Sequence, residues 1–466
     1  MRLHIDKIKV SGKEETFLPG EVGVSFGDAA AIVRRLRGAG HEAFFVGCCV
    51  RDMVRGVTPQ DFDIVTAARP EQVAAIFART VPVGARFGVV LVIEGGHPYE
   101  VATFRLETGY DDGRRPSQVA FATAEEDVRR RDFTVNGLLM DPETGRIIDY
   151  VEGRRDIERS LIRTIGDPRK RFAEDHLRML RAVRFTAALG FAIDPETLAA
   201  IRLQASAIGR ISAERIREEL NRILTSGRAR EGMELLDDSG LLRVILPEAG
   251  ALKGVDQPPT FHPEGDVWEH TLRMLALLPR SDPGIQQSCL AWAVVLHDIG
   301  KAATRSEDEK GVHFYGHVQR GGEIAQRILQ RLRFSLEETE TILALLGGHM
   351  LFINVQKMRP GRLKRFLRQP DFPLHLELHR LDCLGSHGAL DHHAFCLRKL
   401  AEYSKEELRP SPLLTGEDLI GMGYAPGPVF GEILRAVEDA QLGEEVANAE
   451  EARALVLKRW GDPRRL

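Results

Sequence analysis

Apolar positions along this chain repeat with two different periods, and the change falls near residue 166. Before it, short apolar runs of strand length alternate with short helical segments, which is typical of an α/β region. Strands are predicted at 43–46, 61–65, 88–93 and 99–104 and in a hairpin over 138–150, and helices at 29–37, 48–56 and 70–78. After residue 166, apolar residues recur every three or four positions, which predicts helices for most of the remaining length.

Glycine and proline mark the ends of these predicted elements. Gly95-Gly96 turns one hairpin, and Gly190 ends a single helix predicted over 168–189. Pro258-Pro259 and Pro410-Ser411-Pro412 interrupt the helical part. We therefore predict an α+β chain of five segments, namely an N-terminal extension over 1–24, a mixed-sheet head over 25–165, an all-α neck and body over 166–257, a histidine-rich all-α domain over 258–400 and a small helical tail over 401–466.

The net charge of the whole chain hides an uneven distribution of basic and acidic residues. The 466 residues carry 64 Lys and Arg against 68 Asp and Glu, a net charge of -4, which at first argues against a nucleic-acid partner. Between Arg154 and Arg184, however, there are ten basic residues and five acidic ones, a local charge of 10 − 5 = +5. The global balance therefore excludes only a protein that coats nucleic acid indiscriminately.

Membrane and secreted classes are not supported by the sequence. The longest apolar run, 290–296, is far shorter than the roughly 20 residues of a membrane span and fits a buried helix. The first ten residues lack the apolar core of a signal peptide. The five cysteines show no CxxC spacing, which is typical of reduced thiols. We predict a cytoplasmic protein that does not bind membranes.

Asp61 and Asp63 form the first candidate site. Alternate residues of a strand share a face, so both carboxylates are expected to point one way and Phe62 into the core. Two hard oxygen ligands on one face are what a pair of Mg²⁺ ions needs to hold a triphosphate. Upstream, a glycine leads into a short helix carrying Arg51, whose guanidinium suits phosphate oxygens. Glu100 is a candidate third carboxylate for the same metals. Alternatively, it is only an exposed acidic residue on a strand.

Four motifs in a fixed order extend this interpretation. They are VGCCVRD (46–52), DFD (61–63), RRDFTVNGLL (130–139) and AEDHLRMLRAVRF (173–185). Together they resemble the signature of the class II tRNA nucleotidyltransferase and poly(A) polymerase family over residues 44–250. The resemblance implies a polymerase β-like nucleotidyltransferase head with a mixed sheet, followed by the helical neck, body and tail.

The resemblance also implies roles for individual residues. Asp61 and Asp63 would hold Mg²⁺. Glu100, from its strand position and not from the resemblance, is the candidate third catalytic carboxylate. The nucleotide-binding residues would be Gly47, Cys48, Arg51, Arg131, Asp132, Asn136, Glu174, Asp175, Arg178, Arg181 and Arg184. Three of these, at 174, 175 and 178, match the family's amino-acid template for the incoming base, and their spacing predicts one shared helix face. Residues 105–119 resemble the family's flexible loop, which implies use of ATP.

Two positions depart from the family's pattern. Cys48 stands where a second glycine is usual, and cysteine disfavours a positive φ. His176 stands where proline is common and adds no evident chemistry.

Histidine and aspartate residues between 262 and 382 form the second candidate site. Their order resembles that of the HD phosphohydrolase superfamily. The resemblance implies a core ligand set of His270, His297, Asp298 and Asp382 for a divalent transition metal of unknown identity. His317 and His349 would be ligands of a second metal, and Lys301 would neutralise a phosphate. The remaining histidines at 262, 313, 387, 392 and 393 are assigned to loops or the surface.

These features predict an enzyme that adds CCA, or its terminal A, to tRNA 3′ ends from CTP and ATP without a template. The HD domain adds a possible metal-dependent phosphohydrolase. A poly(A) polymerase or a tRNA nucleotidyltransferase that adds only A would carry the same motifs. An RNA-binding protein whose main activity is the HD phosphohydrolase is a hypothesis of another class. The oligomeric state stays open.

Overall fold

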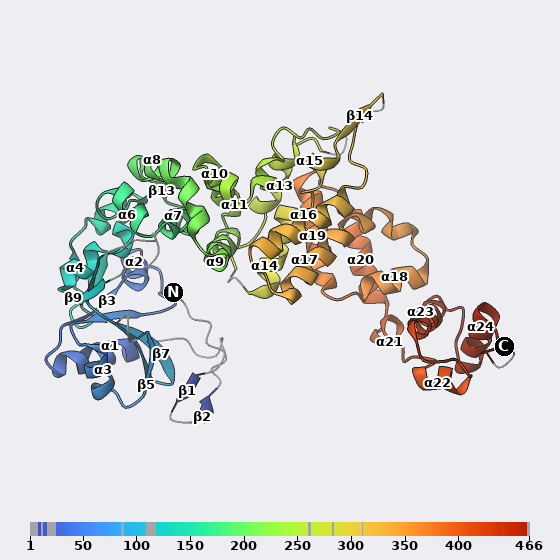
Figure 1. The fold of residues 1–466 in the computed structure, drawn as a ribbon, viewed down its shortest axis with the longest axis horizontal. Coiled ribbons are helices and arrows are strands. Elements are labelled where there is room, and N and C mark those ends of the chain that lie inside the picture. The colour runs from blue at the N-terminus through green and yellow to red at the C-terminus, as the bar shows by residue number, and fades with distance from the viewer. Residues whose placement is uncertain are drawn as a thin grey trace. The chain divides into compact units, whose positions relative to one another are not determined.

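The computed structural model describes residues 8–10, 13–15, 25–84, 88–108, 118–259, 262–281, 284–309 and 311–463. The chain divides into two compact units, Met1–Pro247 and Glu248–Leu466 (Figure 1). Most of the predicted extension over 1–24 and the centre of the predicted loop, 109–117, lie outside the described residues. The division into five segments stays a prediction.

A mixed seven-stranded sheet is the centre of the first unit, as predicted. Its strand order is β11-β10-β3-β4-β7-β6-β5. The bounds are Ala43–Val46 for β3, Asp63–Thr66 for β4, Thr80–Gly84 for β5, Val89–Glu94 for β6, His97–Thr103 for β7, Leu138–Met140 for β10 and Ile147–Asp149 for β11. Only β4 and β7 pair in parallel, and the other neighbours are antiparallel. Apolar side chains from the central strands form a buried core with Val128 and Ile165.

Short helices cover this sheet. They are α1 (Phe26–Gly38), α2 (Cys48–Val54), α3 (Pro70–Ile76), α4 (Ala124–Arg129) and α5 (Gly153–Glu158). Two further strand pairs are β8 (Arg105–Thr108) with β9 (Gln118–Phe121), and β1 (Ile8–Val10) with β2 (Lys13–Glu15). The hydroxyl of Ser25 accepts a hydrogen bond from the Asp28 amide, which caps the start of α1.

The strand predicted over 61–65 begins two residues late. β4 starts at Asp63, which pairs with Val46, the last residue of β3. The next residue, Gly47, instead leads into α2, so β3 offers Asp61 no partner across the ladder. Phe62 is buried as predicted and packs against the rings of Phe26 and Phe45.

The prediction of a single helix over 168–189 is wrong. Two helices, α6 (Pro168–Glu174) and α7 (Leu177–Leu189), are separated by Asp175, whose backbone is extended at φ -141° and ψ 106°. The Asp175 carboxylate accepts a hydrogen bond from the Leu177 amide, which caps α7 and competes with helix continuation. The predicted end at Gly190 is confirmed, with φ 68°.

Helices and a short strand pair complete the first unit. They are α8 (Pro195–Gln204), the 3₁₀ segments η2 (Thr134–Asn136) and η3 (Ala205–Arg210), α9 (Ala213–Leu224), α10 (Ala229–Asp238), α11 (Leu241–Ile245) and the strands β12 (Leu161–Ile162) and β13 (Ala192–Ile193). α9 and α10 both pack on α7, which therefore joins the head to the helical region.

The second unit is helical, as predicted. Its main helices are α13 (Val267–Ala276), α14 (Ile285–Leu296), α16 (His317–Arg331), α17 (Leu336–Gly348) and α19 (Phe372–Gly385), with α18 (Pro360–Leu367) and α20 (Asp391–Glu402) following the 3₁₀ segment η4 (His349–Lys357). The apolar run in α14 is buried between α13, α17 and α19. Shorter elements are α12 (Pro247–Gly250), α15 (Lys301–Thr304), α21 (Lys405–Leu408), β14 (Ser306–Asp308) and β15 (Gly311–His313).

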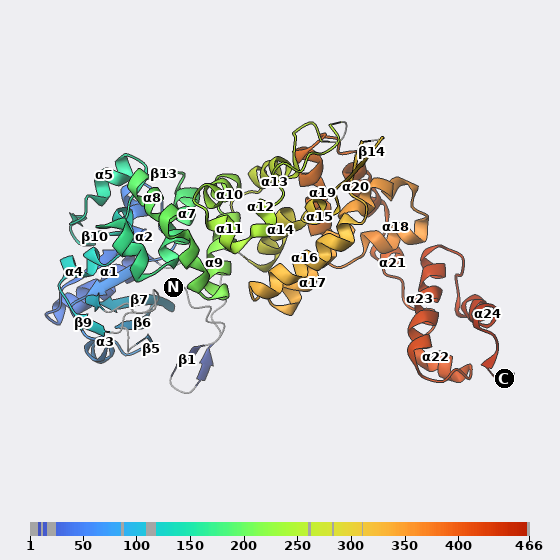
Figure 2. The ribbon, with the colours of Figure 1, turned by 45° about the horizontal axis from the view of Figure 1, so that its top comes forward.

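The tail helices share a separate apolar core. They are α22 (Gly416–Gly421), α23 (Pro428–Leu442) and α24 (Ala449–Trp460), and they lie together in Figure 2. Across the described residues, the helices are too short or too polar to cross a bilayer.

Candidate functional site

Three carboxylates interact beside the central strands β4 and β7 of the head sheet. The parallel pairing of Ile64 with Val101 puts Glu100, on β7, beside Asp63 at the start of β4. Burial, and then the charges of Asp61 and Glu100, raise the pKa of Asp63 to about 7. Carboxylates that repel one another in this way are stabilised by a cation between them. The donor set therefore fits the predicted divalent metal.

Gly47 leaves space beside these carboxylates. Its φ of 78° lies in the left-handed region, and a Cβ atom there would stand 3.6 Å from the Arg131 guanidinium and 3.8 Å from the Asp63 carboxylate. The bare backbone therefore faces the same space as two predicted site residues. Cys48 begins α2 and is not among the described non-glycine residues with positive φ, so cysteine at this position introduces no backbone strain.

A buried polar network connects four predicted nucleotide-binding residues. Arg51 donates to the side-chain oxygen of Asn136 at 2.9 Å, and the Asn136 amide donates to Asp132 at 3.4 Å. The other Asp132 oxygen accepts from Arg181 Nε at 2.7 Å. Burial alone would raise the pKa of Asp132, but Arg181 outweighs it and lowers that pKa to about 2. The network holds the ionised Asp132 carboxylate between the Arg181 guanidinium and the Asn136 amide.

The three residues of the expected base template do not share one helix face, because the chain breaks between α6 and α7. Glu174 ends α6 and accepts from Arg178 at 2.5 Å and from Arg171 at 2.8 Å. The Asp175 carboxylate instead accepts a hydrogen bond from Arg215 of α9 at 3.0 Å. The prediction of a shared helix face is therefore wrong, although the structure keeps Glu174 and Arg178 in direct contact.

Further contacts, which the four motifs did not predict, hold this region in place. Arg178 also donates to the backbone carbonyl of Arg130, and Arg184 donates to the buried Glu219 at 2.6 Å. Asp127, which is buried, pairs with Arg131 at 3.1 Å. Glu219 lies 35 positions from Arg184, so spacing gives no signal for that pair. Asp127 and Arg131 are i,i+4 neighbours, a spacing that could have indicated their ion pair.

In the second unit, three predicted metal ligands have the same hydrogen bond to the backbone. The Nδ1 atoms of His297, His317 and His349 lie 2.9, 2.9 and 2.6 Å from the carbonyl oxygens of residues 294, 314 and 346. A carbonyl only accepts, so Nδ1 carries the proton and Nε2 offers a lone pair. All three Nε2 atoms are buried without a hydrogen-bond partner in the described structure.

The six predicted ligands gather into two adjacent groups. Ligand atoms of His270, His297 and Asp382 lie within 4.8 Å of one another, as do those of a second group, which consists of Asp298, His317 and His349. His297 Nε2 lies 3.2 Å from Asp298 Oδ2, which connects the groups. Burial lowers the pKa of His349 to about 4, so its imidazole is neutral at pH 7, as a metal ligand must be. These residues can hold divalent metal.

Glu264 and His262 also belong to this cluster. His262 lies in a loop, as one of the two predicted placements has it, but it is half-buried and its contact with the cluster was not predicted. One Glu264 oxygen lies 2.8 Å from His270 Nδ1 and 2.8 Å from His262 Nδ1. The Glu264 side chain is fully buried. Burial would raise its pKa, but the hydrogen bonds, first from His270, lower it to about 2. Glu264 is therefore an ionised carboxylate that contacts the predicted ligand His270 on the side of Nδ1.

Lys301 has a partner already. Its ammonium lies 2.7 Å from Asp298 and donates to the Gln257 side chain at 2.6 Å. The lysine is buried, so its ammonium balances the charge of the Asp298 carboxylate. Its contact with a phosphate stays a prediction.

Comparison with known protein families agrees with this layout. Residues 43–163 match the family described as Poly A polymerase head domain, and residues 190–252 match a probable RNA and SrmB-binding site of polymerase A. Residues 267–379 match the HD domain family. The fold and the two sites thus define a class of protein with a poly(A) polymerase-type head followed by an HD domain.

Relatives narrow this class to one family. The CCA-adding enzyme of Latilactobacillus sakei is 40% identical over 273 residues, which cover 57% of this chain and 67% of that protein. That of Geobacillus stearothermophilus is 46% identical over 49% of this chain and 56% of its own length. A solved structure of a Bacillus stearothermophilus CCA-adding enzyme has a TM-score of 0.71 at 29% identity, over 95% of this chain and 99% of that chain.

The chain belongs to the CCA-adding enzyme family. Its match nevertheless spans little more than half the length of the first curated relatives, 56% and 55% of two of them.

Proposed function

We propose that this protein adds CCA to tRNA 3′ ends from CTP and ATP without a nucleic-acid template. The observation that carries the proposal is the group of three interacting carboxylates, Asp61, Asp63 and Glu100, beside the backbone of Gly47, which has no side chain. Family membership supports it, and the Bacillus stearothermophilus relative was solved in complex with CTP. We further propose the cytoplasm as the compartment, consistent with five free cysteines.

We propose Mg²⁺ as the metal of the head, held by Asp61 and Asp63 with Glu100 as the third carboxylate. When bound, Mg²⁺ stabilises the charge that develops on the transferred phosphate. The chain's own residues bind and orient the nucleotide. Arg51 and Arg131 offer cations to the triphosphate. Glu174, Asp175 and Arg178 offer acceptors and donors to the edge of the incoming base, whose pattern differs between C and A.

The test uses purified protein and three tRNA transcripts that end before CCA, after C and after CC. Each is incubated with CTP, with ATP, and with both. We expect extension of all three ends and a stop after one A. Long tails with ATP alone would instead indicate a poly(A) polymerase, and failure on the two C-lacking ends would indicate an enzyme that adds only A. No extension of any end would contradict nucleotidyl transfer.

A second function is proposed for the HD domain, namely metal-dependent hydrolysis of a phosphomonoester or a 2′,3′-cyclic phosphate. It rests on six ligands with three inward-facing Nε2 atoms. When bound, the metal would supply an activated water. Trimming a damaged 3′ phosphate before nucleotide addition would make the two activities complementary.

Substitution of Glu264 is expected to weaken metal binding at this site. Glu264→Ala removes the acceptor behind His270, and the metal affinity should fall roughly 10- to 100-fold. Glu264→Gln keeps an acceptor oxygen at nearly the same position and should retain most of the affinity. Titration of the metal-stripped proteins with Zn²⁺ or Mn²⁺ gives the dissociation constants. Equal affinities for wild type and Glu264→Ala would contradict the orienting role.

A further inference from the structure

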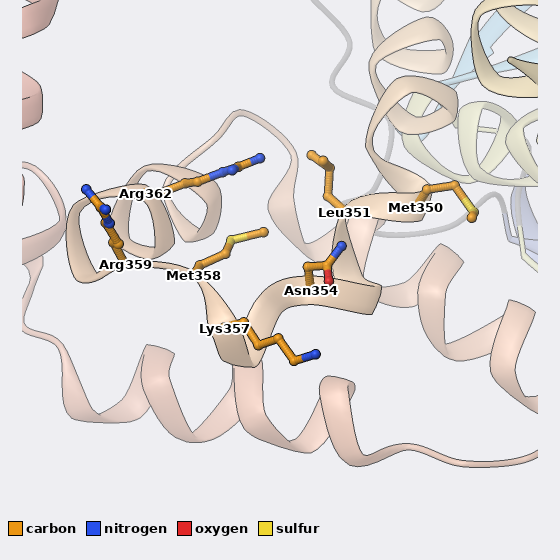
Figure 3. Close-up of a pocket in the computed structure, with 7 residues that line it drawn as sticks. All are labelled: Met350, Leu351, Asn354, Lys357, Met358, Arg359 and Arg362. Atoms are coloured by element: carbon orange, nitrogen blue, oxygen red, sulfur yellow. The ribbon is translucent and has the colours of Figure 1, made fainter.

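A cavity of about 570 Å³ lies between η4 and the start of α18 in the second unit. Figure 3 shows its lining side chains, which come from these two neighbouring segments. Three of them are cations, Lys357, Arg359 and Arg362, and none of the described lining residues is acidic. The cavity therefore offers a concentrated positive charge to a ligand.

The basic residues of α18 and of the two positions that cap it divide into two groups. On one side, Lys364, Arg365 and Arg368 form ion pairs with the acidic residues Glu444, Asp439 and Glu438 in and after α23. On the cavity side, Arg359 and Arg362 form no ion pair or side-chain hydrogen bond within the described chain, and the same is true of Lys357. The fold thus neutralises one side of the helix and leaves the other without a counter-charge.

Apolar side chains lie beside these cations. Met350 is 39% exposed and Leu351 37% exposed, and Met358 is half-buried on the same wall. The amide of Asn354 adds a donor and an acceptor. Cations beside exposed apolar groups suit a ligand that combines negative charge with flat apolar faces, and a nucleic-acid strand carries both in its phosphates and bases.

We propose that this cavity, which we call the η4–α18 pocket, binds the phosphate backbone of an RNA. The RNA is taken to be the tRNA substrate, so this inference rests on the proposed function. A family match assigns RNA binding to residues 190–252, and the η4–α18 pocket would be a separate contact in the other unit. Backbone contacts of this kind add affinity and carry little sequence information.

The test compares two double variants of the full chain that remove the same charge from the same helix. Arg359→Ala/Arg362→Ala acts on the pocket, and Arg365→Ala/Arg368→Ala acts on the paired side. Dissociation constants for a tRNA transcript lacking CCA are measured by filter binding between low and physiological salt. We expect the pocket variant to bind roughly tenfold more weakly at low salt, with a salt slope smaller by about one to two.

The substitution Arg359→Lys/Arg362→Lys keeps both charges and should restore most of the affinity, which separates charge from folding. Equal binding by the pocket variant and wild type, or equal losses in both alanine variants, would overturn the proposal. Wild-type protein is also assayed for CCA addition. Its failure to extend any tRNA would contradict the proposed function, whereas the binding comparison decides separately on the pocket.

Discussion

The substitution Asp63→Asn is expected to stabilise the metal-free protein while abolishing nucleotide addition. Burial and the charges of Asp61 and Glu100 raise the pKa of Asp63 from 3.8 to about 7 in the folded state. The folded protein therefore holds this proton more tightly than the unfolded chain does. As pH rises from about 4 to about 7, the folded state loses stability, because a repelled carboxylate must ionise there.

Asparagine removes that ionisation. The free energy of unfolding should thus match wild type near pH 4 and exceed it by roughly 1–3 kcal/mol above pH 7. Thermal unfolding in EDTA across this pH range measures the difference. Added Mg²⁺ should raise the melting temperature of wild type and have little effect on the variant, because the variant lacks one of the proposed ligands.

The activity should fall on the order of a thousandfold or more, since a metal ligand is lost at the reacting phosphate. Glu71→Gln, an exposed acid on α3, is the matched control and should keep both activity and pH profile. Incorporation by Asp63→Asn within tenfold of wild type would contradict the assignment. An unchanged pH profile of stability would contradict the carboxylate repulsion.

The geometry of the head could be predicted where it depends on neighbours in the sequence. Gly47 lies at a strand-to-helix turn, and the motif that contains it also places Arg51 near the end of the sheet. Phe62 was predicted to be buried from the alternation of a strand, and it is buried, although β4 begins one residue after it. The start of β4 at Asp63 could not be predicted from neighbouring residues, because it depends on where the partner strand β3 ends.

Contacts between distant residues explain the other failures. Asp175 leaves the helix because its carboxylate caps α7 and pairs with Arg215, 40 positions further along the chain. Helical spacing treats every residue between Pro168 and Gly190 alike and carries no information about that partner. In the HD domain the ligands follow a recognisable order, whereas Glu264 acts from a loop that has no helical period.

The substitution Asp298→Asn is expected to remove metal and hydrolase activity from the HD domain without affecting nucleotide addition. Asp298 touches both ligand groups, through His297 at 3.2 Å and through His317 at 3.8 Å. Burial would raise its pKa, but His297 and Lys301 hold that pKa well below the usual range, so the carboxylate is ionised. Asparagine keeps the size of the side chain and removes the only acid of the second group.

Metal content, measured on the purified proteins, should drop sharply, and hydrolysis of a 2′,3′-cyclic phosphate should fall on the order of a thousandfold. CCA addition should stay within about twofold of wild type, because Asp298 and Asp61 belong to different units. The converse variant, Asp61→Asn, should lose addition and keep hydrolysis. Loss of both activities in either folded variant would contradict two independent sites.

Folding is the main risk for Asp298→Asn, because the buried Lys301 loses its anionic partner. Breaking a buried pair costs roughly 3–5 kcal/mol when one charge is left behind. The double substitution Asp298→Asn/Lys301→Met removes both charges and should recover most of the melting temperature without recovering metal. If stability and metal content returned together, the carboxylate would act through the fold alone. If stability returned without metal, Asp298 would act as a ligand.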